Sequence, residues 1–259
     1  MSKHCGILIV LALVAALMSP AVAQTSTPLS VADIVSRMQA AENAEQNRPG
    51  YTLLRQYRLS GADSNTATSQ VLAQVDYVPP SNKEFSIRKT EGNERGERIV
   101  RRVLEHEAKM ARQPVRSDFC ADNYDFALLG KESLNGKTAY VLQLSPKHET
   151  TELLNGKAWV DSDNFLVVKV EGEPAKNPSW WIKDLKIAID YGRADGVWLP
   201  LATRATADIR LLGTHTLTSK DVEVHALTEN AKLTPAPKKT NQPKRSPNSA
   251  VDAGVWVPR

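Results

Sequence analysis

His106 and Glu107 begin the helical His-Glu-x-x-His spacing, in which two histidines bind zinc and the glutamate acts as a general base. The second histidine of this spacing would fall at position 110, where the sequence has Met110. The other histidines of the central region are spread over separate predicted strands and loops, without the spacing of metal ligands: His148, His215 and His225. The sequence therefore predicts no zinc site.

The remaining reactive side chains also lack catalytic partners. Cys120 has no second cysteine nearby, and we interpret it as a small core residue, with a free reactive thiol as the alternative. Asp161 and Asp163 fall on a predicted turn with Asn164, where such residues are common; calcium binding is the alternative. The sequence has no Gly-x-Ser-x-Gly elbow and no glycine-rich phosphate loop. We therefore predict a protein that is not an enzyme and that uses no metal or cofactor.

The N-terminus has the three-part pattern of a secretory signal peptide. Lys3 precedes an apolar run at residues 7–18, and small residues follow this run. We expect residues 1–23 to be removed by cleavage between Ala23 and Gln24. The alternative is a membrane-spanning helix, but the apolar run is shorter than the roughly 20 residues that cross a bilayer. The sequence thus predicts a periplasmic protein.

Residues 231–259 form a basic, proline-rich tail. Six Lys and Arg residues against Asp252 give this tail a charge of +5, whereas the whole chain carries +4. We predict that the tail is disordered, with contact to anionic lipid or cell-wall polymer as the alternative. The body of the protein is therefore slightly acidic. Because it has no basic stripe with interleaved aromatic residues, we predict no binding to nucleic acid.

Two segments have the helical spacing of apolar residues. The first, residues 28–46, has Ser30 as a predicted N-cap and Asp33 three residues later. The second, residues 93–114, places arginines and glutamates around one apolar stripe, and Pro114 marks its end. The stripe consists of Ile99, Val100, Val103, Leu104, Ala108 and Ala111.

The rest of the predicted domain, residues 24–230, alternates between apolar and polar residues with the period of two that is typical of strands with one buried face. We expect about ten or eleven strands, and the short connections favour antiparallel pairing. A sheet of this length must curl. The predicted fold class is therefore mainly β (α+β), with two helices and a sheet that forms a sandwich, a closed barrel or an incomplete barrel filled by helices.

The tetrapeptide LNGK occurs twice, at residues 134–137 and 154–157. Asn-Gly between alternating segments is a strong hairpin signal, because both central residues of a type I′ turn need positive φ. We therefore predict two hairpin turns, one centred on each Asn-Gly pair. The flanking sequences are otherwise unlike, which argues against a duplicated unit.

One parity of each predicted strand is apolar and should face inward. The ordinary interpretation of these residues is a packed core. The alternative is that two helices cannot cover the inner face of so wide a sheet, so that an apolar hollow remains as a binding site. In that case the residues predicted to contact the ligand are Leu53, Tyr57, Val75, Phe85, Leu142, Leu144, Val168, Trp181, Leu185 and Ile187.

The order of these elements, with the segments YVLQLSPK and LNGKAWVD leading into FLVVKVEG, resembles the LolA/LolB-like superfamily of periplasmic lipoprotein-sorting proteins. This superfamily also includes the lipid-sensing domain of the sigma-E regulator RseB. The resemblance covers residues 28–228 and implies an unclosed antiparallel half-barrel. Its inner face, lidded by helices, would take acyl chains. The resemblance also implies that residues 93–113 form the lid, with Ile99, Val103 and Leu104 on it.

The sequence departs from this superfamily at one position. The lipoprotein carriers have an arginine just before the proline that ends an early strand, and this arginine ties the lid to the barrel; here the position is Pro79. Arg55, on the inward side of the preceding strand, is one candidate replacement. The alternative is that the Arg55 side chain extends to solvent at the rim of the sheet.

From the resemblance we expect a periplasmic carrier that binds acyl chains of lipids or lipoproteins and takes part in outer-membrane lipoprotein sorting. The alternative is a regulatory or assembly module of the cell envelope that uses the same fold to contact a protein partner. The expected partners are lipid or lipoprotein acyl chains, with envelope membrane proteins as a further possibility.

Overall fold

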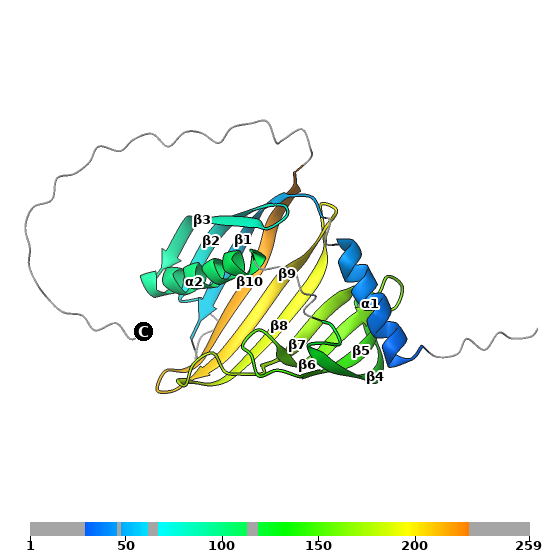
Figure 1. Cartoon of the computed structure of the whole chain (residues 1–259). Helices are drawn as coiled ribbons and strands as arrows, with labels where there is room; N and C mark the ends of the chain where they lie inside the picture. The colour runs from blue at the N-terminus through cyan, green and yellow to red at the C-terminus, as the bar shows by residue number, and fades with distance from the viewer. Residues whose placement is uncertain (1–28, 46–47, 62–66, 113–118, 228–259) are drawn as a thin grey trace, which may run out of the picture.

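The computed structural model describes residues 29–45, 48–61, 67–112 and 119–227 (Figure 1). The predicted signal peptide and the predicted basic tail lie outside the described residues. Within these ranges the chain forms one ten-stranded sheet and two helices, so the prediction of a mainly β fold is confirmed.

Neighbouring strands of the sheet are antiparallel throughout. The order across the sheet is β3-β2-β1-β10-β9-β8-β7-β6-β5-β4, so β1 pairs with the last strand, β10. The edge strands β3 and β4 do not pair with each other, and the sheet is a curved, unclosed half-barrel (Figure 1). The strands are β1 (Tyr51–Ser60), β2 (Ser69–Val78), β3 (Asn82–Gly92), β4 (Tyr124–Leu134), β5 (Lys137–Pro146), β6 (Leu154–Asp161), β7 (Val167–Pro174), β8 (Ile182–Ala194), β9 (Val197–Ile209) and β10 (Gly213–Ala226).

Both helices lie on the same face of the sheet, which we call the inner face. Helix α1 (Val31–Glu45) begins with the predicted cap: the backbone N–H of Asp33 donates to Ser30 Oγ at 3.1 Å, and the backbone N–H of Ser30 donates to the Asp33 carboxylate at 3.2 Å. Helix α2 (Glu94–Ala111) follows its cap residue Asn93. Figure 1 shows α1 against the end of the sheet that carries β4 and β5, and α2 across the end that carries β1 to β3.

The first LNGK segment forms the predicted hairpin turn. It joins β4 to β5, and Asn135 and Gly136 have φ values of 52° and 80°. Both are positive, as a type I′ turn requires. This prediction is confirmed.

The prediction of a second hairpin turn is wrong, because the second LNGK segment lies inside strand β6. Its glycine, Gly156, pairs with Gly172 of β7. A Cβ atom on Gly156 would lie 2.0 Å from the carbonyl oxygen of Glu171, so only glycine fits where these two strands approach so closely. The second Asn-Gly pair thus serves strand packing and makes no turn.

Candidate functional site

The inner face has a closed core at each of its two ends. At one end, Ile34 and Met38 of α1 pack with Leu142, Leu144 and Val170 of the sheet, and all five side chains are buried. At the other end, α2 lies over β2 and β3, and its buried apolar stripe belongs to a cluster that includes Val100, Leu104, Leu53 and Val75. Each helix therefore covers its own part of the sheet, and the two cores are separate clusters.

An apolar strip that we call the inner strip lies between these cores, on β8 and β9. Its members are Leu185, Ile187 and Ile189 of β8, which pair with Ala207, Ala205 and Thr203 of β9. The strip joins both cores, because Ile189 pairs with buried Val170 on one side and Ala205 pairs with Leu217 on the other. All six residues of the strip are only half-buried.

The inner strip offers apolar contact and no reactive group. The β9 side chains are short, so they leave room above that strand for a ligand. Leu185 and Ile187 of β8 supply branched apolar surface. Among the described residues no group of three or more His, Cys, Asp or Glu side chains could hold a metal ion. Cys120 is half-buried and forms no disulfide. The strip is therefore suited to a hydrocarbon ligand, which is held by burial of apolar surface alone.

The predicted contact residues fall into different environments. Five of the ten are fully buried in the two cores, beneath the helices: Leu53, Tyr57, Val75, Leu142 and Leu144. Phe85 packs at the margin of the α2 core, and Leu185 and Ile187 lie on the inner strip. On the predicted lid, Leu104 is buried, whereas Ile99 and Val103 are half-buried. A ligand could reach the buried residues only if a helix moved.

The last two of the ten predicted residues, Val168 and Trp181, lie outside both cores and outside the inner strip. Val168 packs with Ala139, Val141 and Trp159, which form a small cluster on the opposite, outer face. The reason is a β-bulge: Trp159 pairs with Lys169 and the next residue of β6 pairs with Val167, so Val168 is the extra residue. Trp181 precedes β8 at one end of the sheet and is 43% exposed. The prediction that Val168 lines the concave face is therefore wrong.

Arg55 connects α2 to the sheet. The residue is 5% exposed, and its Nη2 donates to the Asp221 carboxylate of β10 at 3.2 Å and to the carbonyl oxygen of Pro200 at 3.2 Å. Its Nη1 lies 3.4 Å from Oε1 of Glu107 on α2. Lys83 of β3 donates to the same Glu107 carboxylate at 2.6 Å. We call these four side chains (Arg55, Asp221, Glu107 and Lys83) the Arg55 network.

The Arg55 network resolves the alternative that the sequence left open. The Arg55 side chain does not extend to solvent at the rim; it lies inside and holds the middle of the sheet to the last turns of α2. Sequence reasoning identified Arg55 but none of its partners. The signal that was available is a charged residue at an inward position of a strand, which holds for Arg55 and equally for Asp221.

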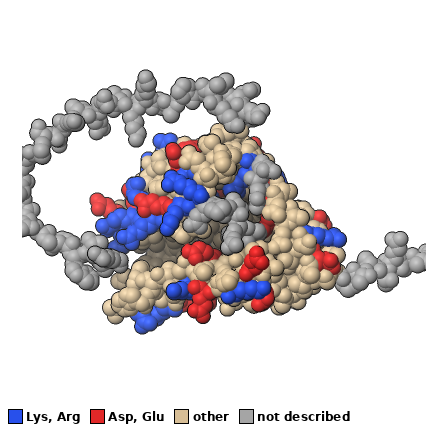
Figure 2. All heavy atoms as spheres, in the orientation of Figure 1, with Lys and Arg blue, Asp and Glu red and all other residues tan. Residues whose placement is uncertain are grey.

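Figure 2 shows Lys and Arg side chains gathered on the solvent-exposed side of α2. This side of the helix exposes Arg95, Arg98, Arg101, Arg102 and Lys109. The opposite side carries the buried apolar stripe and Glu107. Helix α2 is therefore strongly amphipathic. The side of the helix that points away from the sheet is well solvated, whether or not the helix stays docked.

Burial opposes charge throughout the Arg55 network. Burial alone would raise the pKa of the Glu107 carboxyl, but Lys83 and Arg55 outweigh it and hold this pKa below its usual value. For Asp221, burial outweighs the hydrogen bond from Arg55 and raises the pKa. Burial also raises the pKa of the neighbouring Tyr57 phenol. Arg55 stays charged. Burial lowers the pKa of its guanidinium, but the hydrogen bond to Asp221 and the charge of Glu107 together raise this pKa by more than burial lowers it.

We expect acid to loosen α2 from the sheet. Because the folded pKa of Glu107 lies below the ordinary value of 4.5, its ion pairs contribute fully above that value and are lost as the pH falls through the folded pKa. The raised pKa of Asp221 has the opposite sign and favours the folded state at low pH. Hydrogen-exchange protection factors of α2 amides should therefore fall below about pH 4.5, ahead of those of β1 and β10.

A Glu107→Gln variant is the control for this experiment. It removes the titrating group, so the α2 protection factors should be low already at neutral pH and should change little with acid. Protection of α2 in the native chain that stayed constant down to pH ~3 would contradict this role for Glu107.

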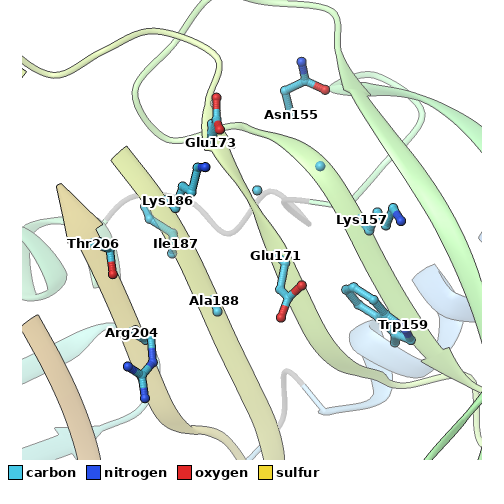
Figure 3. A pocket seen from close by; sticks show the side chains of 12 residues that line it. Asn155, Lys157, Trp159, Glu171, Glu173, Lys186, Ile187, Ala188, Arg204 and Thr206 are labelled. Atoms are coloured by element: carbon cyan, nitrogen blue, oxygen red, sulfur yellow. The ribbon is translucent and has the colours of Figure 1, made fainter. Parts of the chain in front are cut away.

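The outer face carries a groove of about 480 Å³ across β6 to β9 (Figure 3). Its floor is formed by the small residues Gly156, Gly172 and Ala188. Its walls carry charges of both signs, and Figure 3 shows these side chains around the groove: Lys157, Lys186, Arg204, Glu171 and Glu173. This mixture of charges over small residues defines no single ligand chemistry. We therefore place the candidate site on the inner strip.

Comparisons with known proteins return distant matches. A family model described as "Uncharacterized protein" matches residues 115–231, which is less than half of the chain. A search of the curated proteins finds no match. Within the described ranges, neither helix is long and apolar enough to cross a membrane.

Solved structures with a similar fold include a LolA superfamily protein from Nitrosomonas europaea, at 13% identity and a TM-score of 0.42, covering 74% of this chain and 93% of that chain. A domain from Vibrio parahaemolyticus, proposed to be an outer membrane lipoprotein-sorting protein, matches at 11% identity and a TM-score of 0.43, covering 76% and 94%. The MucA/MucB complex of Pseudomonas aeruginosa matches at 9% identity and a TM-score of 0.27, covering 76% and 99%.

These matches include a LolA superfamily structure and MucB. The identities and the TM-scores of these matches are low. We argue the function of this chain from its own residues.

Proposed function

We propose that this protein binds an acyl chain of a lipid or lipoprotein on the inner strip and carries it between sites in the bacterial envelope, in the sorting of outer-membrane lipoproteins. The observation that supports this proposal is the inner strip itself. It is a largely apolar surface, with Thr203 as its one polar residue, and it remains only half-buried between two closed cores, on the face that both helices share. A strip of this kind is stabilised when hydrocarbon covers it.

Hydrophobic burial alone is sufficient to hold such a ligand. Each buried methylene contributes about 0.8 kcal/mol, so about ten methylenes contribute roughly 8 kcal/mol before the cost of ordering the chain. No covalent bond and no metal are needed. The proposed role is therefore binding and transport and not catalysis.

Helix α2 is the element that would move to admit a longer chain. It covers one core with four buried residues, and the Arg55 network adds ion pairs that hold it. If α2 swung away, Leu53, Tyr57 and Val75 would extend the inner strip toward β1 and β2. Under this proposal Leu185 and Ile187 are accessible with α2 docked, whereas Leu53, Tyr57 and Val75 need it to open.

The proposed site of action is the periplasm. This follows from the signal-peptide pattern at residues 1–23, with residues 24–230 as the binding domain. The second candidate function is an envelope module that contacts a protein. One observation favours it. Strand β4 lies at the edge of the sheet and pairs only with β5, and it exposes Leu128 and Leu129.

A lipid measurement tests the proposed function. The protein, purified after export to the periplasm of the host, is extracted with organic solvent for mass spectrometry, and a fluorescent lysophosphatidylcholine is titrated into the delipidated protein. We expect copurified acyl lipids and saturable probe binding that free lysophosphatidylcholine displaces. A protein that holds no lipid and binds no probe would contradict the proposal and leave the envelope module as the explanation.

A further inference from the structure

Four large apolar side chains are exposed together at one end of the sheet. Trp180 and Trp181 precede β8, and Leu211 and Leu212 form the turn between β9 and β10. Their exposed fractions are 83%, 43%, 104% and 56% respectively. We call these four residues the apolar tip. In Figure 1 the β9–β10 turn protrudes at the lower left of the sheet.

The two segments of the apolar tip are held to each other. The backbone N–H of Arg210 donates to the carbonyl oxygen of Trp181 at 2.9 Å, and Arg210 Nε donates to the carbonyl oxygen of Trp180 at 3.1 Å. Strand pairing continues to this point, because Ile182 pairs with Ile209. The two segments that carry the exposed side chains are therefore adjacent and are joined by hydrogen bonds.

Leu211 is fully exposed in the turn between β9 and β10. Leu211 has a φ of 70°, in the left-handed region that leucine rarely adopts. The turn is closed by the backbone N–H of Leu212, which donates to the carbonyl oxygen of Ile209 at 3.1 Å. Because the Leu211 side chain is fully exposed, it buries no apolar surface in the folded protein. Its side chain is available for an external partner.

We propose that the apolar tip docks the protein on the interfacial region of a lipid bilayer. Tryptophan is the side chain best suited to this region, because its indole has a large apolar body and a polar N–H. The leucines add apolar surface that can enter the acyl boundary. Cations stand at the base of the tip: Arg210 is exposed and makes no ion pair among the described residues, and exposed Lys183 lies near Asp208 at 3.6 Å. A guanidinium at this depth complements lipid phosphate groups.

The size of the apolar tip favours a membrane over a protein partner. A stable protein interface uses about 20–30 residues on each side, whereas the tip has four apolar side chains on two turns. Shallow insertion into a bilayer needs no matching surface. This inference does not depend on acyl-chain binding at the inner strip, and its test is separate.

Vesicle flotation tests the proposal. The exported protein is mixed with vesicles of phosphatidylethanolamine and phosphatidylglycerol in a three-to-one ratio, and separately with phosphatidylcholine vesicles, which lack the net charge that attracts the basic tail. We expect binding to both, and a blue shift of tryptophan emission. The double variant Trp180→Ser with Leu211→Ser should partition at least about tenfold more weakly to phosphatidylcholine vesicles.

The matched control is Leu129→Ser with Val222→Ser. These residues are 52% and 54% exposed on β4 and β10, away from the apolar tip, and this variant should bind vesicles like the unchanged chain. Equal binding of the tip variant and the unchanged chain would overturn the proposal, and so would a failure of the unchanged chain to bind phosphatidylcholine. Tip-dependent dimerisation without vesicle binding would also overturn it.

Discussion

Replacing Leu185 with glutamate is expected to abolish binding of a fluorescent lysophosphatidylcholine, with a loss of affinity of at least about 100-fold. Leu185 lies on the inner strip beside Ala207 and is half-buried. A bound hydrocarbon chain would cover the new carboxylate and remove it from water, which costs several kcal/mol. Without ligand the carboxylate keeps access to solvent, so the variant should fold.

The affinity is measured by titration of the probe, and folding is checked by circular dichroism and thermal unfolding. Val222→Glu is the matched control, since Val222 is an exposed apolar residue of β10 and the substitution is chemically the same. It should leave probe binding unchanged. If a folded Leu185→Glu variant bound the probe as tightly as the unchanged chain, the inner strip would not be the site.

Replacing Arg55 with methionine should lower the free energy of unfolding by about 3–5 kcal/mol. The Asp221 side chain is only 1% exposed, and Arg55 is the one residue seen to pair with it among those described. Without the guanidinium, this carboxylate would be left buried and uncompensated. Glu107 would keep Lys83, so the loss is expected to come mainly from Asp221.

Urea unfolding measures this change, and two further variants identify its cause. Arg55→Met combined with Asp221→Leu removes both charges and should recover most of the lost stability, because a buried ion pair can be replaced by apolar side chains of similar volume. Arg193→Met breaks a more exposed pair with Glu45 and should cost less than about 1 kcal/mol. An Arg55→Met variant no less stable than Arg193→Met would show that the network does not support the fold.

Alternation of apolar and polar residues was sufficient to predict most of the sheet. The inward side chains of β1 and β2 follow one parity from end to end. The second LNGK segment shows the limit of this reasoning. Asn-Gly is a local signal for a turn, but Gly156 is set by the approach of β7, which lies beyond any local window.

The candidate site was predictable only in part, for the same physical reason. Parity placed Leu185 and Ile187 on the inner face, but it could not show which inward residues the helices cover. A single bulge in β7 was enough to move Val168 to the other face. The partner of Arg55 lies 166 residues away in sequence. No spacing rule connects such positions.

The pairing of β1 with β10 also determines the order in which this chain can finish folding. Strands β4 to β10 each pair with their neighbours in sequence, so that part of the sheet can form from local contacts as it emerges. Strands β1 to β3 are synthesised first, yet β1 has no neighbour on one side until β10 has been made. Until β10 is present, the β1–β3 part of the sheet therefore has an unpaired edge at β1. Its apolar face is also incompletely covered during this interval. This interval is the stage at which aggregation competes most strongly with folding.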